Sequence, residues 1–182
     1  MKNHNIRLII INSISEAKYF TNKYYPEYNN WFILSTQHFV NDHFNNTNVV
    51  CHHVSEYYSN EFINEEMNLI SEQINRALFN LDNRINTKWS PLIDKVKIDI
   101  FFTLFRYWLK LDYLGISMIQ KAINQIKSFR LINSVYYFSN SKLNNLNFSI
   151  TDIIKSEFTS EVEFFELKHI PTDLSLINKI FN

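Results

Sequence analysis

Residues 7–20 have the sequence RLIIINSISEAKYF, which predicts a strand, a short polar turn and a helix in succession. The four aliphatic residues at 8–11 are typical of a strand that is buried on both faces. The polar pair that follows ends the strand, and Ser13 or Ser15 can cap a helix whose first turn contains Glu16. A strand, turn and helix in this order open a βαβ unit, so we expect this strand to lie at the centre of a sheet.

Four further apolar runs predict the rest of the sheet, at residues 31–34, 48–54, 134–138 and 162–167. Short helices are expected after the first two strands, which is the pattern of right-handed parallel winding. We therefore predict an α/β fold with about five mainly parallel strands, in which the first strand lies between the second and the fourth. The chain, 1–182, is expected to form one such domain, either complete or as a fragment of a two-domain protein. Two short helices are expected near its end, at 144–158 and 172–181.

A pair of long helices interrupts this pattern between the third and fourth strands, at about residues 59–127. In the first helix, 59–86, apolar residues recur at alternating spacings of three and four, which marks one face of a helix. The second helix, 95–127, is apolar almost all round in its middle. We predict that the two helices pack on each other and on one face of the sheet, with Phe105 or Trp108 deep in the contact.

The apolar middle of the second helix also raises the question of a membrane span, which needs roughly 20 mostly apolar residues. Four charged residues interrupt the run: Asp99, Arg106, Lys110 and Asp112. They favour a helix buried within the protein, so we predict no transmembrane segment. Gly115 is expected either to bend this helix or to allow close packing.

Composition restricts the partners and the compartment. Eighteen basic residues balance 18 acidic ones among 182 residues, which argues against binding to nucleic acid and against a polybasic membrane surface, although a local basic patch stays open. The single cysteine, Cys51, excludes an intramolecular disulfide and a multi-cysteine zinc site, and it is predicted to be a buried thiol. The N-terminal sequence does not resemble a signal peptide, so the cytoplasm is the expected location.

Several motifs of catalysis and cofactor binding are absent from the sequence. With one glycine, the chain contains neither the G-x-G-x-x-G dinucleotide fingerprint nor a P-loop, and it lacks H-E-x-x-H and G-x-S-x-G. Neighbouring residues of a strand point to opposite faces, so His52 and His53 are not expected to bind one metal ion together. We therefore predict no cofactor and no metal site.

Polar residues follow the predicted strands, where doubly wound sheets bind their ligands. The candidate substrate-binding residues are Asn12, Ser13, Ser35, Thr36, His38, Ser139 and Asn140. Their small hydroxyl, amide and imidazole groups suit a polar ligand such as a sugar, although strand-end loops are also polar simply because they are solvated. His38 could serve as a general base, but the sequence identifies no carboxylate partner for it, and the catalytic residues stay unassigned.

The order of segments resembles the N-terminal Rossmann-like half of GT-B glycosyltransferases, particularly the bacterial enzymes that build cell-surface polysaccharides. The resemblance is carried by IIINSISEAKYF, by WFILST and by the long helical insertion before SVYYFSNS. It implies a saccharide acceptor and a second domain that binds the nucleotide sugar, so this chain would not catalyse transfer alone. Two alternatives stay open: a non-catalytic module that binds a partner protein through the aromatic helix at 98–114, and a small enzyme with a new strand-end site.

Overall fold

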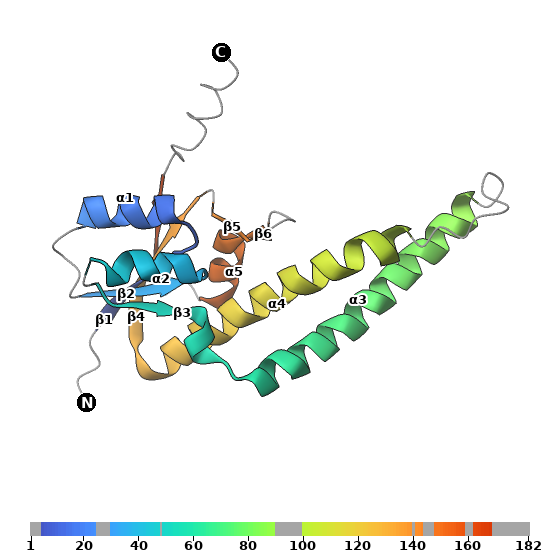
Figure 1. Cartoon of the computed structure of the whole chain (residues 1–182), viewed down its shortest axis with the longest axis horizontal. Helices are drawn as coiled ribbons and strands as arrows, with labels where there is room; N and C mark the ends of the chain where they lie inside the picture. Colours follow the sequence, from blue (N-terminus) through green and yellow to red (C-terminus); the bar gives the residue numbers. More distant parts are fainter. Residues whose placement is uncertain are drawn as a thin grey trace, which may run out of the picture.

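The computed structural model describes residues 5–24, 30–47, 49–89, 100–139, 141–143, 148–158 and 162–168, and it confirms the predicted α/β fold (Figure 1). Five parallel strands form one sheet in the order β3-β2-β1-β4-β7. The strands are β1 (Asn5–Ile11), β2 (Trp31–Ser35), β3 (Cys51–His53), β4 (Leu131–Phe138) and β7 (Glu163–Leu167). As predicted, β1 is central and lies between β2 and β4. The helix predicted at 172–181 lies outside the described residues.

The burial of β1 explains its central position. Leu8 and Ile10 point into one hydrophobic cluster, Ile9 and Ile11 point into another on the opposite face, and all four are buried. Alternation of side chains along a strand produces this division, and only a strand covered on both faces can bury such a run. Of the other strands, β3 is shorter than its predicted run and β4 begins three residues before its own.

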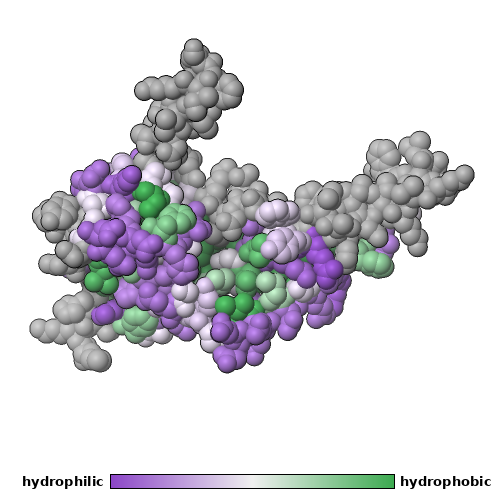
Figure 2. All heavy atoms as spheres, in the orientation of Figure 1, coloured by the Kyte–Doolittle hydropathy of each residue, from purple (hydrophilic) through white to green (hydrophobic). Residues whose placement is uncertain are grey.

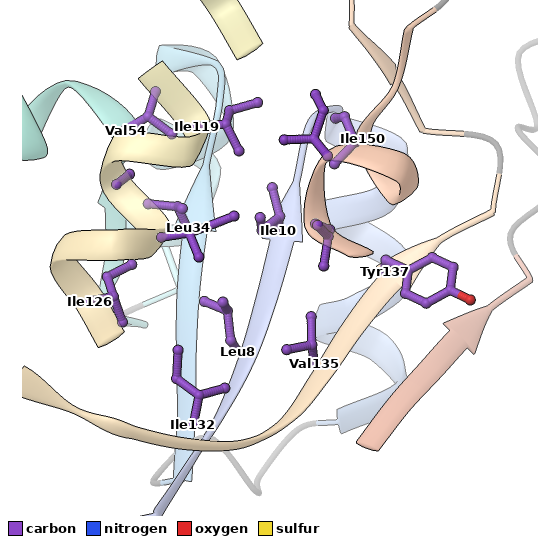
Figure 3. Close-up of a cluster of buried hydrophobic side chains, with 14 of the residues drawn as sticks. Leu8, Ile10, Leu34, Val54, Ile119, Ile126, Ile132, Val135, Tyr137 and Ile150 are labelled. Atoms are coloured by element: carbon purple, nitrogen blue, oxygen red, sulfur yellow. The ribbon is translucent and has the colours of Figure 1, made fainter. Parts of the chain in front are cut away.

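Helices cover both faces of the sheet. One face is covered by α1 (Ile14–Tyr24) and α2 (His38–Asn45), through Phe20 and Phe44 among others. The other is covered by the second half of α4 (Ile100–Phe129) and by α5 (Ile150–Glu157), as Figure 3 shows for the side chains around Leu8 and Ile10. A short 3-10 helix, η2 (Val54–Tyr57), leads from β3 to α3 (Asn60–Trp89). A small antiparallel pair, β5 (Lys142–Leu143) and β6 (Phe148–Ser149), was not predicted.

The two long helices form a hairpin that projects beyond the sheet (Figure 1). As predicted, α3 packs on α4, but the part of α4 that contacts the sheet is 119–126. The expectation that Trp108 lies deep in the contact is wrong, because its side chain is 43% exposed; the side chain of Phe105 lies outside the described set. The physical reason is length: a 30-residue helix spans about 45 Å, whereas strands of five to eight residues span about 17–27 Å.

Two further predictions concern Gly115 and the possibility of a membrane span. A side chain added at Gly115 would meet no atom within 4 Å, so close packing among the described residues does not account for this glycine. Within the described parts of the chain, no helix has both the length and the apolar character that crossing a membrane requires.

Candidate functional site

The carboxyl ends of the five strands meet at one edge of the sheet because all five are parallel. The chain first adds strands on one side of β1, giving β2 and β3, and then on the other side, giving β4 and β7. The strand order therefore reverses between β1 and β4, and the crevice outside such a switch point is where sheets of this kind bind ligands. The predicted site residues that the structure describes follow strands that end at this edge.

Asn12 and Thr36 are brought together at the ends of β1 and β2. The Thr36 N–H donates to the carbonyl of Ile11 at 3.2 Å, which extends the strand pairing by one residue. The Thr36 hydroxyl donates to the Asn12 side-chain oxygen. Two of the predicted residues thus form one polar contact beside the switch point.

Ser13 caps α1, and the Glu16 side chain folds back onto the turn that precedes the helix. The Glu16 N–H donates to Ser13 Oγ at 3.2 Å, and the Asn12 N–H donates to Glu16 Oε2 at 2.7 Å. Ser13 Oγ also lies 3.1 Å from Ser15 Oγ. Burial raises the pKa of the Glu16 carboxyl, and hydrogen bonds from the backbone N–H groups of Asn12 and Ser13 offset part of that rise. The turn after β1 is therefore held by a buried acidic side chain.

The raised pKa of Glu16 predicts a pH-dependent difference between the natural chain and Glu16→Gln. The folded state binds the proton of Glu16 more tightly than the unfolded state, so its contribution to stability grows as pH falls toward the unfolded value of 4.5 and is lost as pH rises through the folded pKa. Glutamine retains an oxygen for the Asn12 N–H but does not titrate. We expect the unfolding free energy of the natural chain, minus that of Glu16→Gln, to increase from about pH 7 to about pH 4.5 in urea titrations. If the unfolding free energies of the two proteins change in parallel with pH, the prediction is wrong.

Ser35 is buried in a hydrogen-bonded corner between β2, α2 and β3. Its hydroxyl donates to Asn41 Oδ1, and the Asn41 amide donates to the carbonyl of Cys51 at 3.3 Å. The Cys51 thiol lies 3.1 Å from the same Asn41 oxygen, and burial raises its pKa to about 12. Cys51 is thus the buried thiol that the sequence predicts, and the Ser35 hydroxyl is already engaged within the protein.

His38 faces another imidazole. Its ring stacks on that of His53 with centroids 3.8 Å apart and planes at 21°. The Ser55 N–H donates to His53 Nδ1 at 3.1 Å, which places the proton of the neutral ring on Nε2. Burial, and then the nearby His38, lower the pKa of His53. Parallel stacked rings direct their nitrogen lone pairs side by side, so this pair does not converge on a metal ion.

His52 lies on the other side of β3, as the alternation along a strand predicts. Its ring stacks on Phe32 with centroids 4.7 Å apart, and its Nδ1 lies 2.8 Å from Glu56 Oε2. Among the residues that the structure describes, no group of three or more His, Cys, Asp and Glu side chains could hold a metal ion.

The remaining predicted residues follow β4. The Ser139 N–H donates to the carbonyl of Leu167 at 3.4 Å and so continues the pairing with β7, whereas Asn140 lies outside the described residues. Ser141, which is not among the predicted site residues, is buried near the Glu16 carboxyl, and its hydroxyl has no hydrogen-bond partner among the described residues. The edge therefore contains a contact of Asn12 with Thr36, a stacked pair of histidines, and a buried Ser35 between them.

Sequence reasoning missed the burial of Glu16 and the role of Asn41. The spacing Ser13-x-x-Glu16 is a capping-box pattern, and it could have indicated that this carboxylate folds back on the turn. Asn41 carried no comparable signal, because its contacts depend on how α2 packs. In comparisons with protein-family models, with curated proteins and with solved structures, nothing matched this chain.

Proposed function

We propose that this chain is the acceptor-side domain of a GT-B glycosyltransferase of bacterial surface-polysaccharide biosynthesis, and that it binds a saccharide at the carboxyl edge of its sheet. The observation that supports this most directly is the polar contact of Asn12 and Thr36 beside the β1–β4 switch point. Ser13, at the start of α1, and Ser139, after β4, lie on either side of the same switch point.

The chemistry of this edge suits sugar hydroxyls, which both donate and accept hydrogen bonds. Amide and hydroxyl groups do the same, and the Glu16 carboxylate beside the switch point is buried and already accepts a hydrogen bond from the Asn12 N–H. A nucleotide sugar, by contrast, is usually held through its phosphates by backbone N–H groups of a glycine-rich loop, a motif that the sequence lacks. In this proposal a second domain binds the donor, and this chain alone does not catalyse transfer.

The test is a titration with oligosaccharides followed by amide chemical shifts. We expect shifts at 12–13, 36–38 and 139, with weak binding that changes little between low and high salt because charge pairing is not involved. Thr36→Val removes the hydroxyl with little change of shape and should weaken binding about fivefold to tenfold, since one hydrogen bond is worth about 1 kcal/mol. Thr47→Val is the matched control: its hydroxyl donates to the Phe44 carbonyl at the opposite end of α2.

Three outcomes contradict the proposal. Shifts confined to α4, or an equal loss for both threonine variants, leave the edge without a saccharide site. Tight binding of a free nucleotide by this chain assigns the edge to phosphate recognition instead.

A second candidate function is a module that binds a partner protein through the aromatic part of α4. It is favoured by the exposure of Tyr107 and Trp108, which are 64% and 43% exposed on the projecting half of the helix. Exposed aromatic side chains are common at interfaces. Shifts at these two residues on adding a partner, with no response to oligosaccharides, select this candidate.

A further inference from the structure

Acidic and basic residues are segregated along α3. The first half of the helix carries four carboxylates: Glu61, Glu65, Glu66 and Glu72. The second half has a basic excess, with Arg76, Arg84 and Lys88 against Asp82. The helix therefore has an acidic end near the sheet and a basic end toward the tip of the hairpin, although the whole chain has no net charge.

An apolar groove lies where the charge changes sign. It is a hollow of about 210 Å³ between α3 and α4, called here the hairpin groove, and Figure 2 shows apolar side chains gathered there with hydrophilic ones along its border. Its main lining residues are Ile70, Ile74, Ala77, Leu78, Leu109 and Tyr113. Tyr113 is 45% exposed, so the groove is open at the surface.

One stripe of α3 borders the hairpin groove. Its residues follow one another at spacings of four and three: Glu66, Ile70, Gln73, Ala77, Asn80 and Arg84. Such spacing places side chains along a single edge of a helix. The stripe is symmetric in charge about Asn75, because Glu66 lies nine positions before that residue and Arg84 nine positions after it.

We infer that the hairpin groove is covered by a second copy of this chain, with the two α3 helices antiparallel and a two-fold axis that passes between the two stripes at the level of Asn75 along the helix. In this arrangement Glu66 of each copy faces Arg84 of the other, so the same ion pair forms twice, as two-fold symmetry requires. The small Ala77 faces Gln73 near the axis and lets the helices approach. The groove residues that are still accessible in one copy, Ala77, Leu109 and Tyr113, are then covered in a four-helix contact.

The charge pattern selects this occupant and its orientation. A parallel pair of α3 helices would place Glu66 beside Glu66 and Arg84 beside Arg84, and like charges in register disfavour that alignment. An anionic membrane surface would be attracted by the basic half but repelled by the acidic half of the same stripe. Only a partner with the reverse order of charges fits the whole length, and a second copy turned by 180° has that order.

Charge reversal tests the inference in solution. Sedimentation velocity at up to about 100 μM should show a species of twice the 21.9 kDa chain mass. Glu66→Arg and Arg84→Glu should each weaken dimerisation at least about tenfold, because each creates two like-charge contacts. The double variant exchanges the partners and should restore dimerisation to within about threefold. Circular dichroism melts of all variants establish that they are folded.

The matched control is Glu72→Arg, which changes the same charge on the same helix. Glu72 pairs with Arg76 within α3 at 2.8 Å, both side chains are exposed, and neither belongs to the stripe. This variant should dimerise as the natural chain does. A natural chain that stays monomeric overturns the inference, whether or not it binds anionic vesicles. Equal weakening by Glu72→Arg, or no recovery in the double variant, overturns it as well.

Discussion

Replacing Phe20 by alanine should lower the free energy of unfolding by about 3–5 kcal/mol. Phe20 is fully buried in α1, and its ring lies 5.0 Å from that of Trp31 and 6.3 Å from that of Phe44, measured between centroids. These contacts join α1 to β2 and to α2, so the variant would leave a cavity among three elements. Urea unfolding followed by circular dichroism measures the loss.

Phe79→Ala is the matched control for this prediction. The same side chain is removed, but Phe79 is 62% exposed on α3, and such surface changes usually alter stability by no more than about 0.5 kcal/mol. Alanine is also the better helix former, which offsets the small area lost. A loss below about 1 kcal/mol for Phe20→Ala, or equal losses for the two variants, contradicts the assignment of Phe20 to the core.

The central strand was predictable because its signal is local. Residues 8–11 are aliphatic without interruption, and only burial on both faces accommodates that pattern in a strand. The order of the strands follows from the right-handed connection between parallel strands, which restricts the arrangements of the short helices. Neither the central position of the first strand nor the strand order requires knowledge of how distant side chains pack.

The placement of α4 was not predictable in the same way. Its most apolar part precedes Leu114, whereas the sheet contact uses Ile119, Ala122, Ile123 and Ile126. An apolar run shows that a helix can be buried but does not say which turns reach the sheet. That depends on where the helix enters, which is set by η2 and by the start of β4 at Leu131.

The position of the candidate residues at one edge of the sheet was predictable, whereas their side-chain contacts were less so. The strand-end rule placed Asn12 and Thr36 at one edge, and their contact follows from the pairing of β1 with β2. The engagement of Ser35 by Asn41 and the stacking of His38 on His53 depend on how α2 and η2 pack, which one sequence does not encode locally. The sequence identified no carboxylate partner for His38, and the side chain that contacts it in the structure is the imidazole of His53.

Ile123→Ala should lower the global free energy of unfolding by about 2–5 kcal/mol, because Ile123 is fully buried where α4 lies on the sheet. Ile74→Ala makes the same change in a separate cluster, where Ile74 packs with Ile70, Leu78 and Leu114 in the projecting hairpin. A cluster outside the main core can open without unfolding the sheet. We expect Ile74→Ala to speed amide exchange in α3 while leaving that of β1 unchanged, and Ile123→Ala to speed exchange in both. If Ile74→Ala also accelerates exchange in β1 to the same degree, the hairpin and the sheet unfold as one unit and the assignment of two separate clusters is wrong.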